Sequence, residues 1–154
     1  MIRLRAATAS DLARVHELLE AARLPTDGLG DQFPDAYVVA ESDGRVVAAA
    51  GIERHGTWGL LRSVVVAADR RGTGIGERLV RERLDWARQS RLDAVYALTT
   101  TAADYFPRLG FSAAPRDGAP EELKASREFA SVCPSSAICL RIDVPNFDNA
   151  AVPR

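Results

Sequence analysis

The sequence predicts one α/β domain with a mixed, mostly antiparallel central sheet and helices on both faces. Two features of the 154 residues support this prediction. Three apolar segments separated by short turns come first, which favours an antiparallel meander. A helix-like segment and a further apolar strand follow, which is the order of a strand–helix–strand unit. Because no repeat or linker interrupts this order, we expect a single domain over residues 1–144 and a loosely packed tail over 145–154.

The first elements follow from local patterns. Apolar and charged residues alternate over residues 2–6, which predicts a short half-buried strand. Thr8 and Asp11 have the spacing of a capping box at the start of a helix. Apolar residues then recur with helical spacing until Leu24-Pro25 ends the helix.

The remaining elements are expected in the same way. Asp43-Gly44 supplies a hairpin turn between the first two strands of the meander. Gly110 should close a short helix in AADYFPRLGF. The expected strands cover about 36–41, 45–54, 58–67, 93–99 and 137–142, and the expected later helices cover about 74–89 and 121–129.

Composition narrows the function classes. The formal net charge of −1 gives no electrostatic reason to expect nucleic acid or an anionic membrane as a partner. The charged N-terminal residues do not resemble a signal peptide, and no segment is long enough to span a bilayer, so we expect a cytoplasmic protein. Cys133 and Cys139 have no nearby histidine, so we expect free thiols and no metal site.

The segment VVVAADRRGTGIGERLV, residues 64–80, is the strongest motif. A dinucleotide fingerprint needs G-x-G-x-x-G; Gly72 and Gly74 fit, but Glu77 occupies the third glycine position. A P-loop needs Gly-Lys followed by Ser or Thr, which the chain lacks. A plain strand-to-helix turn with spare glycines remains open.

An anion-binding loop explains the glycines better. The first amides of a helix have no partner within the helix, and the helix dipole adds positive charge there. Glycine also lets the backbone approach a ligand closely. We therefore expect the consecutive amides of residues 72–76 to bind a pyrophosphate, with Arg70 and Arg71 adding charge beside it.

These residues resemble the GNAT acetyltransferase superfamily. The run Arg71, Gly72, Thr73, Gly74, Ile75, Gly76 matches its [QR]-x-x-G-x-[GA] acetyl-CoA loop and follows an apolar strand, LLRSVVV. The segment AADYFPRLGF resembles the short helix that ends in Gly-Phe in that family. The segments GLLRSVVV, LTTTAADYFPRLGF and EFASVCPSSAICL are similar to an arsenic-resistance-associated subfamily. The stretch LTTTA with the following Phe106 also resembles the acetyltransferase domain of N-acetylglutamate synthase.

The resemblance implies an N-acetyltransferase that uses acetyl-CoA, no metal, and a small, amino-acid-like amine as acceptor, which attacks the thioester directly. The family often dimerises, which makes a homodimer a candidate state. Its fourth and fifth strands splay apart, and the pantetheine pairs with backbone that corresponds to Val64, Val65 and Val66. Thr100, within a run of threonines at the end of the fifth strand, and Phe106 would also contact the cofactor.

The catalytic acid is open. The family often has a tyrosine four residues before the glycine of Gly-Phe, to protonate the thiolate. That position is Phe106 here, and Tyr105 is displaced by about 100° around the helix axis. Tyr105 is the candidate acid, and a packing role for it is equally compatible with the sequence.

The base and the acceptor contact are also open. The family's frequent glutamate position is Leu60 here, so Glu53 is the best carboxylate, against the alternative of a solvated charge at a strand end. His55 or a bound water could serve instead. Arg62 interrupts an apolar strand, so it either pairs with an internal carboxylate or holds an acidic acceptor.

Two function classes therefore remain. The first is an acetyl-CoA-dependent N-acetyltransferase. The second is a non-catalytic acyl-CoA-binding module that kept the anion-binding loop and lost the acid and base. A metalloid-binding role for Cys133 and Cys139 competes with burial of cysteine as a small apolar residue.

Overall fold

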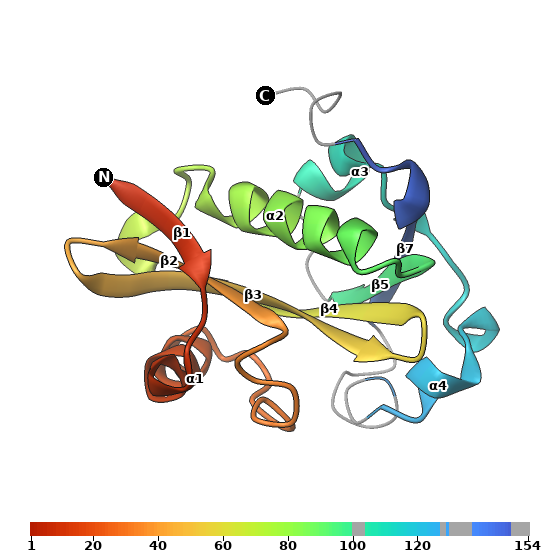
Figure 1. The fold of residues 1–154 in the computed structure, drawn as a ribbon, viewed down its shortest axis with the longest axis horizontal. Coiled ribbons are helices and arrows are strands. Elements are labelled where there is room, and N and C mark those ends of the chain that lie inside the picture. The colour runs from red at the N-terminus through yellow and green to blue at the C-terminus, as the bar shows by residue number, and fades with distance from the viewer. Residues whose placement is uncertain (100–103, 127–128, 130–136, 149–154) are drawn as a thin grey trace.

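A computed structural model describes residues 1–99, 104–126, 129 and 137–148. Its centre is one seven-stranded sheet with the strand order β1-β2-β3-β4-β5-β7-β6 (Figure 1). The strands are β1 (Ile2–Ala6), β2 (Tyr37–Ser42), β3 (Arg45–His55), β4 (Trp58–Val66), β5 (Ala94–Thr99), β6 (Ser112–Ala113) and β7 (Ile138–Asp143). The helices are α1 (Leu12–Ala21), α2 (Ile75–Gln89), α3 (Tyr105–Leu109) and α4 (Glu121–Lys124).

The pairing confirms the predicted mixed sheet. Strands β1 to β4 form an antiparallel meander, and β5 pairs antiparallel with β7. Strands β4 and β5 are parallel, with α2 as the crossover between them. A parallel connection of this kind needs a helix-length crossover.

The splaying of β4 and β5, which the resemblance implied, is visible in the register. The parallel pairing runs from Trp58 opposite Ala94 to Leu61 opposite Ala97 and then stops. Strand β4 continues to Val66 beside β3, whereas the last residues of β5 stay paired with β7. The edge of β4 that faces β5 is therefore open beyond Leu61.

Helices cover both faces of the sheet, as predicted (Figure 1). Val15, Leu18 and Leu19 of α1 pack with residues of β2, β3 and β4 on one face. The other face carries α2, whose Val80 and Leu84 pack in the largest apolar cluster. The periodic apolar spacing of both helices is what places one stripe of each against the sheet.

Three expectations need correction. The helix expected over 121–129 ends at Lys124, since α4 has a single turn. The short edge strand β6 was not expected, because two residues carry no periodic signal. Phe147 is buried within the main apolar cluster, so the start of the expected loose tail is packed against the core. Among the described residues, no helix is long and apolar enough to cross a membrane.

Candidate active site

The open edge of β4 begins at a bulge. Between the pairs Ala49–Val65 and Gly51–Arg62, β4 has one residue more than β3. Ser63 lies in this bulge with a positive φ of 58°, which is uncommon for a residue with a side chain. A bulge bends its strand, so β4 changes direction close to the point where it separates from β5.

The three valines of this edge face different ways. Val64 and Val66 pack toward α2, whereas Val65 is buried in the cluster that contains α1. On the other edge of the strand, Val65 and Val66 pair with β3. Their backbone groups that face the gap have no β5 neighbour, which is the condition for pairing with an extended ligand.

The glycine loop adopts the geometry expected of an anion-binding turn. Gly72 and Gly74 have positive φ values of 79° and 83°, and Gly74 is the residue before α2. A Cβ at either glycine would meet no other atom within 4 Å, so the space above the loop is open. The hydrogen bond from Arg78 N to Gly74 O, at 3.2 Å, lies in the first turn of α2. The amides of residues 75–77 come before it, at the N-terminal end of the helix, where amides have no acceptor within the helix.

Two side chains fasten this loop. Arg71 Nε donates to the carbonyl of Val66 at 3.2 Å, and Thr73 Oγ1 donates to the carbonyl of Arg70 at 2.6 Å. The first bond connects the loop to the end of the open strand. It therefore fixes the position of the amides relative to the β4 edge.

Tyr105 and Phe106 lie at the start of α3. Phe106 is buried, and its ring contacts those of Tyr105 and Phe111 at centroid distances of 4.8 and 5.2 Å. Tyr105 is partly buried, and its desolvation raises the pKa of the phenol, so the hydroxyl stays protonated at neutral pH. Gly110 closes α3 with a φ of 111°.

The Tyr105 hydroxyl lies beside the first turn of α2. A Cβ built on Gly76 would be 3.6 Å from Tyr105 Oη and 3.7 Å from Val66 Cγ2. The hydroxyl is thus near the Val66 end of the open edge, on the side of the glycine loop. Thr100 and Cys133 lie outside the described residues. Cys139 is a buried free thiol, and its burial raises the pKa of the thiol, which disfavours the thiolate that binds metals.

A polar cavity of about 260 Å³ lies on the face of the sheet opposite α2. Arg62 pairs with Gly51, so it shares a face with Glu53 and His55 on the neighbouring strand. The lining is completed by the loop before β2 and by α4, and the described residues that line it are Gly28, Asp31, Gln32, Glu53, His55, Arg62, Glu122, Ala125 and Ser126.

Glu53 is the centre of a hydrogen-bonded network in this cavity. Its Oε2 accepts from Arg62 Nη1 at 3.3 Å, and its Oε1 lies 3.3 Å from His55 Nε2. The side chains of Glu53 and Arg62 are 7% and 1% exposed. The alternative of a solvated Glu53 at a strand end is therefore wrong, because the carboxylate is buried in an ion pair. Of the two alternatives for Arg62, pairing with an internal carboxylate is the one observed.

The network continues to the bulge. Arg62 Nε donates to Ser63 Oγ at 3.0 Å, and Ser63 Oγ lies 3.1 Å from Tyr37 Oη. The ring of Tyr37 lies over Gly51, where an added Cβ would be 2.5 Å from the ring. This chain of contacts connects the cavity to the place where β4 leaves β5. Sequence reasoning missed it because the five participating residues come from three strands.

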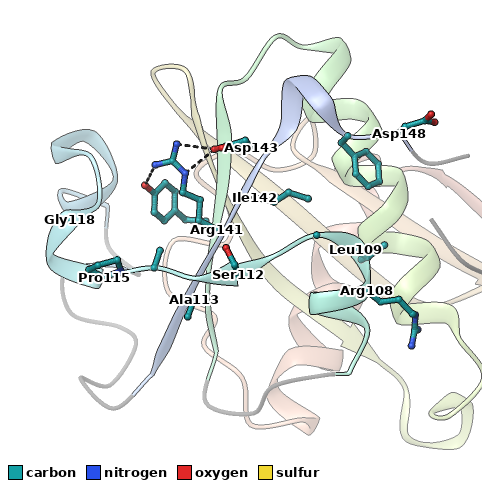
Figure 2. Close-up of a pocket in the computed structure, with 14 residues that line it drawn as sticks. Arg108, Leu109, Ser112, Ala113, Pro115, Gly118, Arg141, Ile142, Asp143 and Asp148 are labelled. Atoms are coloured by element: carbon teal, nitrogen blue, oxygen red, sulfur yellow. Dashed lines mark hydrogen bonds and ion pairs between the residues drawn. The ribbon is translucent and has the colours of Figure 1, made fainter. Parts of the chain in front are cut away.

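A larger hollow of the described structure lies elsewhere. It has a volume of about 720 Å³ and runs along β6, β7 and the end of α3 (Figure 2). Arg141 donates to Tyr96 Oη at 2.7 Å and pairs with Asp143 at 2.9 Å. None of the described residues proposed from the sequence lines this hollow, so a larger volume alone does not mark the functional site.

The glycine loop and the open strand edge agree with the match to known proteins. The model of the acetyltransferase (GNAT) family matches residues 6–111, which is more than half of the chain. The chain belongs to the GNAT acetyltransferase family. The match includes the open edge of β4, the glycine loop and α3, and it ends at Phe111.

Several GNAT proteins are similar over longer stretches. An amino-acid acetyltransferase of Ralstonia nicotianae is 31% identical over 129 residues, which are 77% of this chain and 28% of that protein. The N-acetylglutamate synthase of Neisseria gonorrhoeae, complexed with coenzyme A and N-acetyl-glutamate, superposes with a TM-score of 0.78 at 20% identity, over 94% of this chain and 35% of that one. Rv2747 of Mycobacterium tuberculosis, in complex with CoA, gives a TM-score of 0.76 at 20% identity, over 92% and 98% of the two chains.

These similarities support different conclusions about this chain. At 20% identity the two structures show a shared fold. This chain spans less than a third of the length of the Ralstonia relative, so that protein's whole activity does not transfer to it directly. The family match shows membership of the GNAT acetyltransferase family.

Proposed function

We propose that this GNAT protein transfers the acetyl group of acetyl-CoA to the amine of a small, amino-acid-like acceptor by direct attack in a ternary complex. The observation that carries the proposal is the open edge of β4. One end of this edge meets the glycine loop, and the other end meets the polar cavity at Arg62. A cofactor along the edge would present its thioester to an acceptor in the cavity.

On the cofactor side, the pyrophosphate would bind the amides of residues 72–76, with Arg71 beside it. The pantetheine would pair with the backbone of Val64, Val65 and Val66, and the buried ring of Phe106 would border the gap. Thr100 is proposed as a further contact on the sequence alone. Coenzyme A in the neighbouring structures of the fold supports this use of the loop.

The position of Tyr105 refines its proposed role. Because the pyrophosphate end lies at Val66, the thioester would lie at the other end of the edge, near Ser63. The Tyr105 hydroxyl is beside Gly76 and Val66, and it is protonated at neutral pH. We therefore assign Tyr105 as a hydrogen-bond donor to the cofactor. The leaving thiolate, with a pKa of about 8.5 for a thiol of this kind, can take its proton from water.

On the acceptor side, Glu53 and Arg62 are proposed to border the reacting amine. The cavity volume of about 260 Å³ is just below the usual range of ligand pockets, which fits a small acceptor. The N-acetyl-glutamate bound to the Neisseria enzyme makes an acidic amino acid a reasonable first acceptor to test. Arg62 lines the cavity, and we propose that its guanidinium contacts the acceptor carboxylate while it stays paired with Glu53. The resemblance to the arsenic-resistance-associated subfamily adds amine-bearing arsenic compounds to that list.

A second candidate function is a non-catalytic acyl-CoA-binding module. The specific observation in its favour is the buried Phe106 at the position where the family often has its acid. Both functions predict acetyl-CoA binding, and only the first predicts turnover.

The experiment that separates them measures release of free thiol from acetyl-CoA with a panel of amines. The panel contains L-glutamate, other amino acids, diamines and aromatic amines, and mass spectrometry confirms the N-acetyl product. Turnover above the rate without amine supports the transferase. Tight acetyl-CoA binding with no product from any amine would support the binding module.

A further inference from the structure

His55 lines the polar cavity, and its imidazole lies next to the carboxylate of Glu53. Its Nε2 lies 3.3 Å from Glu53 Oε1, and its side chain is 20% exposed, compared with 7% for Glu53. In the described part of the chain, no hydrogen-bond partner of His55 Nδ1 is found. His55 also lines the cavity that borders the proposed acceptor position.

The oxygens of Glu53 are already engaged. Oε2 accepts from Arg62 and Oε1 faces His55, so the carboxylate has both oxygens directed at neighbouring side chains. An amine in the cavity reaches an imidazole edge more readily than this buried carboxylate. Glu53 is therefore better suited to orient a base than to act as one.

The contact with Glu53 selects one tautomer of the neutral imidazole. A carboxylate accepts hydrogen bonds, so His55 Nε2 must carry the hydrogen. The other nitrogen, Nδ1, then has a lone pair that can accept a proton. Once protonated, the imidazolium would be stabilised by the same carboxylate, which Arg62 holds in place. A carboxylate that fixes the tautomer and then stabilises the cation is the arrangement that makes histidine an effective base.

We propose that His55 is the general base of the transfer reaction and that Glu53 and Arg62 are its positioning residues. This inference rests on the proposed function. The acceptor enters as an ammonium ion, and His55 Nδ1 takes one of its protons. The freed lone pair attacks the thioester carbonyl, the C–S bond breaks, and the thiolate leaves. The new amide nitrogen loses one further proton, the thiolate gains one, and His55 returns its proton to solvent.

Other charges face His55 across the cavity. Asp31 lies on the loop before β2, and Glu122 lies on α4, where its Oε2 accepts from Trp58 Nε1 at 3.1 Å. Both carboxylates favour an ammonium ion in the cavity. The positive charge of Arg62 disfavours an ammonium ion in the cavity, but Glu53 pairs with Arg62 and offsets that charge. The described lining is thus suited to an acceptor that arrives with its proton.

The first test needs no acceptor. The chain has two histidines, His16 and His55, so ¹⁵N-detected NMR of the imidazoles gives two spin systems that His16→Gln assigns. We expect neutral His55 to carry its hydrogen on Nε2, and Glu53→Gln to change this tautomer balance without moving His16. His16 is a suitable reference because it lies on α1 and pairs with Glu20. A neutral His55 with its hydrogen on Nδ1 would overturn the proposal.

The second test uses the fastest amine of the panel. His55→Gln should lower kcat/KM by about 10²-fold or more, the usual range for a general base. In a plot of kcat/KM against pH, the fall at low pH should move to the pH range in which the acceptor amine loses its proton in solution. Acetyl-CoA affinity should not change. Glu53→Gln should give a smaller loss, and His16→Gln should match the wild type.

The outcomes are separable. A folded His55→Gln variant with the wild-type pH profile would overturn the role of His55 and leave the transferase assignment intact. No turnover with any amine would instead overturn the proposed function. Because circular dichroism and acetyl-CoA binding report folding independently of turnover, an unfolded variant cannot be mistaken for an inactive one.

Discussion

The glycine loop and the polar cavity lie at opposite ends of the same strand edge, and they are built in different ways. The loop is one continuous segment, residues 70–76, whose shape follows from two glycines with positive φ and the start of α2. The cavity is assembled from the loop before β2, the strands β3 and β4, and α4. The loop offers backbone amides, whereas the cavity offers charged side chains that depend on one another.

This difference sets what a substitution does at each place. A side chain at Gly72 or Gly74 would meet open space, so a change there has no packing cost beyond the strain of a positive φ and acts mainly on ligand binding. In the cavity, Glu53, Arg62 and His55 form one network, so a change at one residue affects the others. The two regions should therefore respond to mutation in opposite ways, and the following expectations test that contrast.

The largest effect on folding is expected at Arg62. Arg62→Leu leaves the Glu53 carboxylate buried without its cation, and breaking a buried ion pair in this way costs about 3–5 kcal/mol. Urea unfolding measures the loss. The double variant Arg62→Leu, Glu53→Leu should recover most of the stability, since it removes both charges. A single variant within about 1 kcal/mol of the wild type would contradict the buried network.

Gly74→Ala should affect binding more than folding. Its Cβ would enter the space where the pyrophosphate is proposed to bind, so we expect acetyl-CoA affinity to fall by about 30- to 150-fold, or about 2–3 kcal/mol. Gly44→Ala is a matched control, because Gly44 also has a positive φ, 76°, and open space around it. Calorimetry and thermal unfolding should show equal stability losses in the two variants. Equal acetyl-CoA affinity in both would mean that the loop does not hold the cofactor.

A third variant lies outside both regions. Asp11 reaches back to the amide of Thr8 at 2.8 Å, as the capping box predicted, and also pairs with Arg5. The bonds from Arg5 lower the pKa of Asp11 to about 2 from 3.8. The stabilisation is therefore present above about pH 4 and is lost as the pH falls through 2.

Asp11→Asn should thus cost about 1–2 kcal/mol at neutral pH and much less near pH 2. Urea unfolding at the two pH values measures this difference. Acetyl-CoA affinity and turnover should not change, which separates general stability from effects at the site. A cost that is independent of pH would show that the loss comes from packing and not from the carboxylate.

The smallest effect is expected at Tyr105. Tyr105→Phe keeps the ring and removes the hydroxyl beside Gly76, so the KM for acetyl-CoA should rise by about 3- to 10-fold, the loss of roughly one hydrogen bond. The kcat should change by less than a few-fold. A fall in kcat of about 10²-fold or more in a folded variant would instead make Tyr105 the acid that protonates the thiolate.

The same contrast explains what could be read from the sequence. The glycine loop was predictable because its function depends on local backbone geometry, and Gly72, Gly74 and the following helix lie next to one another. The antiparallel meander of β2, β3 and β4 followed from turn signals and periodicity. Residues 121–129 were expected to form one helix, yet α4 ends after Lys124, since propensity did not mark its end.

The cavity could not be predicted in the same way. Glu53 and Arg62 are nine residues apart, and their contact depends on the hairpin register that places Arg62 opposite Gly51, on the same face as Glu53. A charge near a strand end gives no sign that α4 and the loop before β2 will cover it. The arginine in an apolar strand was the one available signal, and it did not specify its partner.

The most direct test compares acetyl-CoA binding and saturated turnover in Gly74→Ala and His55→Gln. The account predicts that Gly74→Ala weakens acetyl-CoA binding and, at saturating acetyl-CoA, retains kcat within a few-fold. It predicts that His55→Gln binds acetyl-CoA like the wild type and loses kcat. The reverse pattern, or a loss of both properties in each folded variant, would contradict the assignment of cofactor binding to the loop and proton transfer to the cavity.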